Sequence, residues 1–596
     1  MLLQLKDAAA IESANSIIRE LLAAHTEWFL TEDGHAPIAL TRTEFDLSIA
    51  HRRLIFAIWS ETGSRSWRVR AWNWTGEKLL LEVSRRMGAE TATLALVPRA
   101  SAKAIVASIA AARQARCERL AQIVAQTLEG VGGRVLGVDK GEGVGGRVLG
   151  VDRGGPNLDI QQRGSLAGVR AALYPHPKPN TQPLTTEQHP KPNTQHPTTE
   201  LHSETGKPRS AHFSTKIERA ILSPGMRRDQ PGRYARILLR LRHQRLAVTA
   251  TVAQNDVRNV DSLFSSALLW FNRLLALPKR PYVEKMILVV ERNTLEAARQ
   301  RQVLLCDSMR RRIELWKIDE DWEDLQPVAP LERKTLWRKR LTRFPSVVEA
   351  DTSERAKQIV SQSVQAIDVV NSRHGQTLRY HGLPFARLRR VMHNDRVWFG
   401  IEGSRRRSLD GYHERDWLKL LTDLQTYRQT SCRDRRHWYY RAAAEAWLES
   451  ILRRDITKLD PGLIIAPLHA QFRTAQGAAN GARPIDLLAL RQDGRLVVIE
   501  LKVNEDREHV FQGLDYWRRV EAHRRRGHIS SAKLFSDREI SDESPLVYLV
   551  APALRFHPSF TTLAKMVAPD IEIYRFDINE DWRGGVRVVR RERVNE

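Results

Sequence analysis

The sequence predicts a multidomain protein of the α/β (α+β) class, with helices and strands throughout the chain. Three observations support this prediction. A length of 596 residues leaves room for about three or four domains of roughly 150 residues each. Two short repeats divide the chain within its first third. From Tyr440 onward, apolar patterns alternate in the order helix, two hairpin strands, helix, strand, helix, strand.

Residues 1–128 predict an N-terminal α+β domain. Its apolar patterns indicate helices at Ala14–Leu22 and Ala102–Leu128, and strands at Leu54–Trp59, Ser66–Trp74 and Thr91–Val97. The strand Ser66–Trp74 alternates three tryptophans with arginines. Stacking on nucleic-acid bases is one interpretation of this pattern. Packing of a half-buried strand is the other interpretation, and we favour it.

Residues 129–210 predict a flexible linker of low complexity. Gly130–Asp139 recurs at Gly143–Asp152, and His176–Gln182 recurs at His189–Gln195, each with a period of 13 residues. Glycine-rich phosphate binding is a poor interpretation, because the first repeat lacks the Gly-Lys-Ser/Thr ending of a P-loop. Both repeats contain too few large apolar side chains to offset the entropy of ordering, so we expect no packed core here.

Residues 211–426 predict a middle α/β domain whose function the sequence does not reveal. Short strands are expected at Arg236–Leu241, Lys285–Val290 and Arg312–Trp316. The helix Val260–Leu277 has an apolar stripe that indicates a core-facing side, formed by Leu263, Ala267, Trp270 and Leu274.

A basic helix is expected at Leu331–Arg343, where Arg338 and Lys339 belong to a run of cationic side chains. Such a helix can follow a phosphate backbone without reading base sequence. A solvated helix face is an equally good interpretation.

Residues 427–596 contain the most informative pattern, a predicted hairpin. Two apolar runs flank Gln492–Gly494, in which Asp-Gly is a strong hairpin signal. If Gly494 is left-handed in a three-residue loop, Arg491 pairs with Arg495 and Asp486 lies opposite Glu500. Since side chains alternate with period two, Lys502 shares the face of Glu500.

Two carboxylates and one ammonium group would therefore converge on an otherwise apolar hairpin. Burial of such groups is costly unless they pair or bind a cation. Carboxylate oxygens suit magnesium, and a nearby lysine can orient an attacking water. A plain salt bridge from Lys502 to Asp486 or Glu500 is the alternative interpretation.

Flanking helices add polar groups to this hairpin. The predicted helix Asn504–Gly527 carries Gln512, Tyr516 and Arg519 beside its buried stripe, and the helix Tyr440–Lys458 carries Glu445 and Glu449 one turn apart. Gln512 and Tyr516 are placed to contact a phosphate or water. Either glutamate is a candidate third carboxylate.

This segment resembles the PD-(D/E)XK nuclease superfamily from about Tyr427 to its end. Pro484-Ile485-Asp486 and Glu500-Leu501-Lys502 match the signature, and Gln512-Gly513-Leu514-Asp515-Tyr516 looks like the Q-x-x-x-Y element of helicase-associated exonuclease domains and mismatch-type endonucleases. The resemblance implies a restriction-endonuclease-like mixed sheet flanked by helices. It implies Asp486, Glu500 and Glu449 (less favourably Glu445) as metal ligands. It further implies Lys502 as the catalytic lysine, with Gln512 and Tyr516 as active-site supports.

Composition agrees with a polyanionic partner. The formal net charge is +25 with a pI near 10.3, which favours nucleic-acid binding, although arginine-rich coding is an alternative source of diffuse charge. We expect Arg338, Lys339 and Arg519 to contact nucleic acid. Three widely spaced cysteines indicate a reducing compartment. No apolar run approaches the roughly 20 residues of a membrane span, so we expect a cytoplasmic protein without a membrane partner.

The sequence thus predicts a magnesium-dependent nuclease that hydrolyses phosphodiester bonds, with DNA as the favoured substrate and manganese as a substitute metal. A non-catalytic nucleic-acid-binding protein that retains the nuclease fold is the alternative. Cleavage mode, specificity, protein partners and oligomeric state are not predicted from these residues.

Overall fold

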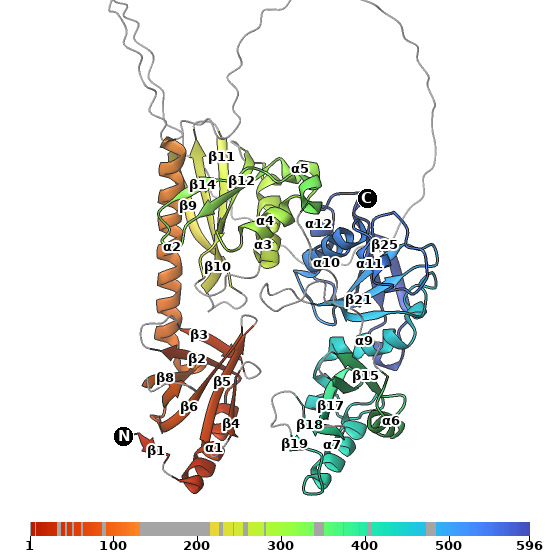
Figure 1. Ribbon diagram of the computed structural model, residues 1–596. Helices are drawn as coiled ribbons and strands as arrows, with labels where there is room; N and C mark the ends of the chain where they lie inside the picture. The colour runs from red at the N-terminus through yellow and green to blue at the C-terminus, as the bar shows by residue number, and fades with distance from the viewer. Residues whose placement is uncertain are drawn as a thin grey trace, which may run out of the picture. The chain divides into compact units, whose positions relative to one another are not determined.

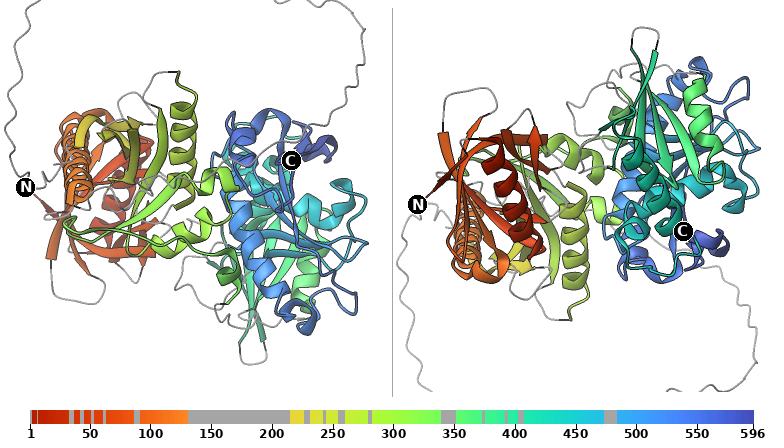
Figure 2. Two further views of the ribbon diagram at one scale, coloured as in Figure 1. Left: turned by 90° about the horizontal axis from the view of Figure 1, so that it is seen from above. Right: turned by 90° about the horizontal axis from the view of Figure 1, so that it is seen from below.

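The computed structural model is a mixed α+β protein, and its described residues form four separate sheets (Figures 1 and 2). It describes residues 2–5, 7–32, 37–41, 45–50, 53–60, 63–85, 91–130, 215–225, 231–241, 244–253, 260–278, 282–338, 351–372, 375–391, 394–401, 407–472 and 484–596. Glu129 and Gly130 belong to a helix that ends at Gly130, and the rest of the predicted linker 129–210, with the remainder of the repeats, lies outside the described residues. Among the described residues, no helix is long and apolar enough to cross a membrane.

The N-terminal sheet is antiparallel and is covered by one helix. Its strand order is β3-β2-β8-β7-β6-β5-β4, and β1 pairs with β6. The elements are β1 (Leu3–Gln4), α1 (Ala8–Ala23), β2 (Glu27–Glu32), β3 (Ile38–Thr41), β4 (Phe45–Ala50), β5 (Arg53–Ser60), β6 (Gly63–Trp74), β7 (Leu79–Arg85), β8 (Thr91–Pro98) and the 3-10 turn η1 (Arg99–Ser101). The predicted helix Ala14–Leu22 and the three predicted strands are confirmed.

The tryptophans of β6 belong to the core of this sheet. Trp67 and Trp72 are buried, Trp67 stacks on Phe56, and Trp74 packs against the same apolar cluster. Their faces are therefore occupied by protein, and the packing interpretation of Ser66–Trp74 describes them better than base stacking.

The helix α2 (Lys103–Gly130) follows this sheet in the chain but packs along the middle sheet (Figures 1 and 2). The Cys117 thiol donates to the carbonyl oxygen of Ile221 at 3.5 Å, and Arg119 donates to the carbonyl oxygen of Trp322 at 3.2 Å. The sequence places this helix in the N-terminal domain 1–128, but in the structure it packs against residues that follow the linker.

The middle sheet has the order β14-β13-β12-β11-β10-β9. The pairs β11–β12 and β12–β13 are parallel, whereas the others are antiparallel. The elements are β9 (Thr215–Pro224), β10 (Pro231–Leu241), β11 (Gln244–Thr251), α3 (Val260–Leu275), β12 (Val283–Glu291), α4 (Leu295–Gln302), α5 (Asp307–Arg310), β13 (Ile313–Ile318) and β14 (Leu325–Pro327). The predicted stripe of α3 is confirmed as core.

The basic helix predicted at Leu331–Arg343 is not present over its described part. There the chain forms only the 3-10 turn η3 (Arg333–Trp337), and residues 339–350 lie outside the described residues. Leu336 is buried, and the Trp337 ring packs edge-on against Trp517. We attribute the short turn to these tertiary contacts, which outweigh helical propensity.

The range 211–426 contains a second, separate sheet that the sequence analysis did not distinguish. This third sheet is an antiparallel meander, β15-β16-β17-β18-β19, and α6 and α7 share its apolar cluster. The elements are α6 (Glu354–Ser361), β15 (Ile367–Ser372), β16 (Gly375–Tyr380), β17 (Leu383–Val391), β18 (Asn394–Phe399), β19 (Arg407–Ser408) and α7 (Glu414–Tyr427).

The C-terminal sheet has the order β20-β21-β22-β23-β24-β25, with a parallel centre β22-β23-β24 between antiparallel edges. The elements are α8 (Trp438–Arg441), α9 (Ala444–Arg454), the 3-10 turn η4 (Ile456–Lys458), β20 (His469–Phe472), β21 (Ile485–Leu490), β22 (Leu496–Leu501), α10 (His509–Arg524), α11 (His528–Ser531), β23 (Leu546–Pro552), η6 (Ala553–Arg555), α12 (Phe560–Ala564), β24 (Ile573–Ile578), η7 (Trp582–Gly584) and β25 (Val588–Arg593).

The predicted element order is confirmed here, with β20 and β25 as additional strands. Residues of α9 pack on one face of the sheet, and residues of α10 and α12 pack on the other. The predicted helix from Asn504 begins only at His509. The Asp506 carboxylate accepts a hydrogen bond from the Glu508 amide at 2.7 Å, and such a turn competes with helix formation.

Candidate active site

The hairpin β21–β22 has the register that the sequence predicts. Leu487 pairs with Ile499 and Leu490 with Leu496. Arg491 and Arg495 close a three-residue loop, in which the Arg491 amide donates to the Arg495 carbonyl at 2.9 Å. Gly494 adopts a φ of 81° in that loop, the left-handed conformation that glycine tolerates best. Local turn chemistry therefore fixes which side chains face each other.

One step further along this register, the acidic groups meet. The Asp486 carboxylate accepts a hydrogen bond from the Leu501 amide at 2.9 Å, next to Glu500. Lys502 extends back along the same face, and its Nζ lies 2.8 Å from Oε1 of Glu500. Asp506 lies near the same ammonium group, at 3.8 Å. The predicted convergence of Asp486, Glu500 and Lys502 is thus present.

Helix α10 covers this face of the sheet and brings Gln512 close to it (Figure 1). Gly513 makes the close approach possible, because a Cβ atom there would lie 2.6 Å from the Leu549 side chain of β23. Gln512 is buried in consequence. A larger residue at position 513 would require either the Leu549 side chain or the helix, and with it Gln512, to move.

Two buried oxygens at this face have no hydrogen-bond partner among the described residues. They are Oε2 of Glu500 and Oε1 of Gln512. Glu500 is 1% exposed, so bulk solvent barely reaches its side chain. An unsatisfied buried carboxylate oxygen is costly, and such exceptions call for a ligand, a proton or an ion.

The charges around these oxygens perturb one another. Burial and the neighbouring Asp486 carboxylate raise the pKa of Glu500 well above its usual value, and Lys502 only partly offsets this. Burial alone would lower the pKa of Lys502, but Glu500, Glu445 and Asp486 together raise it. The lysine is therefore held in its charged form by an excess of carboxylates.

Of the two helix glutamates, Glu445 is the one coupled to this group. The residue has a solvent-exposed surface, but desolvation by the surrounding protein raises the pKa of its carboxyl group. The Lys502 charge lowers this pKa, whereas the Asp486 charge raises it. Glu449, one turn later on α9, instead forms a buried ion pair with Arg379 of β16 at 3.2 Å. The structure thus brings Glu445, the less favoured candidate, to the hairpin and ties Glu449 to the third sheet.

His509 is a member of the site that sequence reasoning missed. Its Nε2 lies 3.2 Å from the Glu500 carbonyl oxygen, and its ring stacks on Phe556. Burial and the nearby Lys502 lower its pKa to about 3, so the ring is neutral and supports the β22 backbone. A lone histidine in the first turn of the helix after Glu-x-Lys was the available signal.

Tyr516 and Arg519 are occupied by internal contacts. Tyr516 is 4% exposed and belongs to the apolar cluster of Leu488 and Val498. The Arg519 guanidinium lies 5.2 Å from the centre of the Tyr516 ring and forms an ion pair with Asp515. Both side chains therefore support the helix rather than face an open site.

Two predicted nucleic-acid contacts remain, Arg338 and Lys339. Arg338 is exposed just after η3. Lys339 lies outside the described residues, so the structure leaves that prediction as it was.

A second ionic cluster on α10 was also missed by the sequence analysis. Asp515 is buried and accepts hydrogen bonds from Arg301 of α4 at 2.7 Å and from Arg518 at 2.9 Å. Arg301 also binds Asp261 of α3 at 2.6 Å. Burial alone would raise the pKa of Asp515, but the arginines hold it well below its usual value. This cluster joins the middle sheet to α10.

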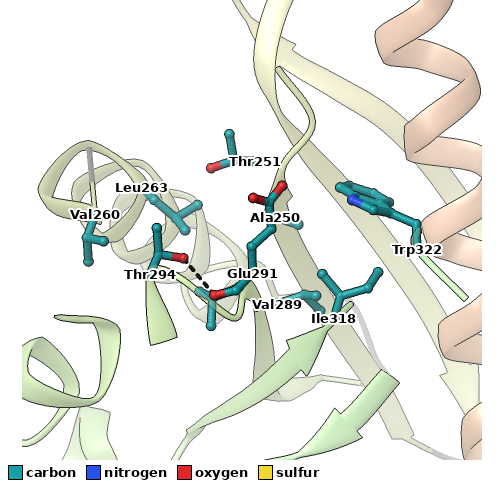
Figure 3. Close-up of a pocket in the computed structure, with 10 residues that line it drawn as sticks. Ala250, Thr251, Val260, Leu263, Val289, Glu291, Thr294, Ile318 and Trp322 are labelled. Carbon is teal, nitrogen blue, oxygen red and sulfur yellow. Dashed lines mark hydrogen bonds between the residues drawn. The ribbon is translucent and has the colours of Figure 1, made fainter. Parts of the chain in front are cut away.

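A small pocket elsewhere lacks such a combination of charges (Figure 3). It lies where the parallel strands β11, β12 and β13 end, and Thr251, Glu291 and Trp322 are among its lining residues. Burial raises the pKa of Glu291, Arg116 opposes the shift and Glu320 adds to it. No lysine lines this pocket among the described residues, and we do not place the active site here.

Among the residues that the structure describes, no three His, Cys, Asp or Glu side chains already lie at metal-binding positions. Comparisons with protein-family models, with curated proteins and with solved structures gave no match. The site must therefore be interpreted from its own chemistry.

Proposed function

We propose that the chain is a metal-dependent nuclease that hydrolyses phosphodiester bonds of nucleic acid, with DNA as the favoured substrate. One observation carries the proposal: the carboxylates of half-buried Asp486 and buried Glu500 lie beside Lys502, and Oε2 of Glu500 has no partner among the described residues. A plain salt bridge accounts for Oε1 of Glu500 but not for the second oxygen.

The donor set fits a hard divalent cation such as magnesium, with manganese as a substitute. Asp486, Glu500, Glu445 and Asp506 outnumber the single ammonium of Lys502 among the charges coupled here. The excess negative charge and the two unpartnered oxygens favour a cation with oxygen ligands. Asp486 and Glu500 would hold it, with Glu445 a better third ligand than Glu449.

When bound, such a cation lowers the pKa of a water and stabilises charge that develops on the phosphate. The chain's own groups would complete the chemistry. Lys502, kept charged by its neighbours, would orient the attacking water and stabilise the negative transition state. Gln512 would direct its free Oε1 toward that water, and His509 would keep the β22 backbone in position through the Glu500 carbonyl.

The architecture supports this proposal. A hairpin leads into a parallel sheet centre, and helices lie on both faces, which is the arrangement that a PD-(D/E)XK nuclease fold would require. The site residues come from α9, β21, β22 and α10, in the order that the resemblance implies. The net charge of +25 is suited to a polyanionic substrate.

The test is magnesium-dependent cleavage of plasmid and of single-stranded DNA, with wild type beside Asp486→Ala. We expect cleavage by the wild type alone. Calcium should support DNA binding without turnover, because its looser geometry activates water poorly. Equal rates with calcium and magnesium would contradict the proposed chemistry. Binding without cleavage in any metal would instead favour the non-catalytic nucleic-acid-binding protein.

A further inference from the structure

The outer face of the third sheet presents an unusual group of side chains. We name it the basic sheet face; it consists of Thr377, Arg387, Arg389, Arg396 and Trp398. The three arginines are exposed, and Trp398 is half-buried. The opposite side of the sheet is apolar and shares its cluster with α6 and α7. Strand alternation therefore places these five residues together on the open side.

Like charges face each other directly on this surface. Arg389 pairs with Arg396 across β17 and β18, and Arg387 pairs with Trp398 beside them. Like charges directly opposite on a sheet are destabilising. By contrast, Arg390 on the other side of β17 lies opposite Asp395. Within the described residues, the side chains of these three arginines form no ion pair or hydrogen bond. Many other arginines of the chain form ion pairs with Asp or Glu.

This surface continues to the helix that carries Glu445. Two residues along β16 from Thr377, Arg379 forms its ion pair with Glu449 of α9. At the following turn, Gly382 has no room for a Cβ atom, which would lie 1.9 Å from the Ala446 carbonyl oxygen. The sheet is thus in backbone contact with α9 one residue from Glu445, so the basic sheet face leads toward the catalytic group.

We infer that the basic sheet face holds an unpaired strand of the nucleic-acid substrate next to the active site. This inference rests on the proposed function and names the substrate form. Unpaired arginines on one face match phosphates, which would relieve the repulsion between Arg389 and Arg396. Trp398 offers an aromatic surface on which an unstacked base can lie. A duplex would present its phosphates but would not offer a free base to this ring.

The experiment compares two triple variants of the full chain. The first, Arg387→Ala with Arg389→Ala and Arg396→Ala, removes the charges of the basic sheet face. The control, Arg390→Ala with Arg415→Ala and Lys419→Ala, removes three exposed cations from β17 and α7 that lie outside that face. Binding is measured by fluorescence anisotropy in calcium, with a single strand of roughly 20 nucleotides, longer than the site of one such platform, and with its duplex.

The first variant should bind the single strand at least about tenfold more weakly than the control. The slope of log affinity against log salt should shrink by about 2, as expected for three lost phosphate contacts at roughly 0.7 each. When Trp398→Ala is added to the first variant, single-strand binding should weaken by about a further tenfold. Trp398→Phe should retain most of the binding that Trp398→Ala loses. Hydrolysis of a small phosphodiester, bis(p-nitrophenyl) phosphate, should be unchanged in every variant of this face.

Equal losses in both triple variants would overturn the inference, as would a loss confined to duplex binding. A first variant that cleaves and binds single strands normally would overturn it while leaving the nuclease proposal intact. If the first variant loses strand binding but no protein cleaves DNA or the small diester, the proposed function fails and the strand-binding face stands. Thermal unfolding of the variants confirms that the sheet is still folded.

Discussion

Helix α10 takes part in two buried ionic clusters that differ in one respect, the balance of their charges. In the first cluster, the carboxylates of Asp261 and Asp515 pair with three arginines: Arg301, Arg518 and Arg519. Asp515 forms an ion pair with each of the three. At the other cluster, carboxylates outnumber Lys502, and oxygens of Glu500 and Gln512 have no partner among the described residues. Glu500 and Asp515 are both buried, so the burial of the central acid alone does not distinguish the two clusters.

The ratio of carboxylates to cations distinguishes a buried cluster that stabilises the fold from one that is a candidate for chemistry. A cluster whose arginines outnumber its carboxylates lowers the pKa of its acid, as for Asp515, and it stabilises the fold without a ligand. A cluster whose carboxylates outnumber its cations raises the pKa of its acid, as for Glu500, and a bound cation would stabilise it. Perturbed acids that lack partners are therefore better site candidates than perturbed acids that have them.

The largest expected effect is on cleavage. Asp486→Ala, Glu500→Ala or Lys502→Ala should each reduce the rate by on the order of 10²–10⁴-fold, because each removes a group that holds the metal or orients the water in the proposed mechanism. DNA binding in calcium should remain largely intact, since phosphate contacts elsewhere supply affinity. Magnesium-dependent cutting by Glu500→Ala at the wild-type rate would remove this cluster from the mechanism.

The next effect is on stability and concerns the Asp515 cluster. Asp515→Ala leaves Arg301 without one of its two carboxylates in a buried position, and such a loss typically costs about 3–5 kcal/mol. We expect urea denaturation to show this decrease in the free energy of unfolding. The control Asp537→Ala removes an exposed carboxylate and should change little. A loss of cleavage by Asp515→Ala with unchanged stability would show that the two clusters do not differ as described.

A smaller effect should separate the two glutamates of α9. Glu445→Gln should weaken magnesium binding by about 10-fold or more with little change in stability, because it removes a charge coupled to Asp486. Glu449→Gln should instead lower the free energy of unfolding by about 1–3 kcal/mol, because Arg379 loses its charged partner. Magnesium titrations and urea denaturation of both variants measure these outcomes; the reverse pattern would restore Glu449 as the ligand.

The pH dependence of stability should have opposite signs at the two clusters. The raised pKa of Glu500 means that the metal-free folded state keeps a proton that the unfolded chain loses, so stability falls as the pH rises from about 4.3 to the folded pKa. Asp515 contributes its full stability above about pH 3.9 and loses it as the pH falls through its lowered pKa. The advantage of Glu500→Gln over wild type in metal-free urea denaturation should therefore grow with pH. An advantage that shrinks with rising pH would contradict the assignment.

The smallest effect is expected from the linker. Both clusters lie on residues that follow it, so deletion of Gly143–Glu200 should leave cleavage near the wild-type rate. Limited proteolysis should first cut between about Gly130 and Lys216, because the sequence there is rich in glycine and proline. A folded deletion variant without cleavage would show that this segment has a direct role.

Sequence alone determined the local part of the site. The Asp-Gly turn and period-two alternation are properties of neighbouring residues, and they were sufficient to place Asp486, Glu500 and Lys502 on one face. The helical stripe of α3 and the element order after Tyr440 follow from the same kind of short-range pattern. These predictions succeeded because each depends on backbone geometry within one hairpin or one helix.

Only the tertiary structure decided what depends on packing between distant segments. Glu445 and Glu449 lie on the same side of α9, so their spacing in the sequence does not decide which of them meets the hairpin. In the structure, Gly382 contacts Ala446 and Arg379 pairs with Glu449. Glu445 is therefore the glutamate that remains near the hairpin. The salt bridge between Asp515 and Arg301 likewise joins residues 214 positions apart. A sequence pattern specifies which side chains share a face, whereas the partner that this face meets is set by how the elements pack.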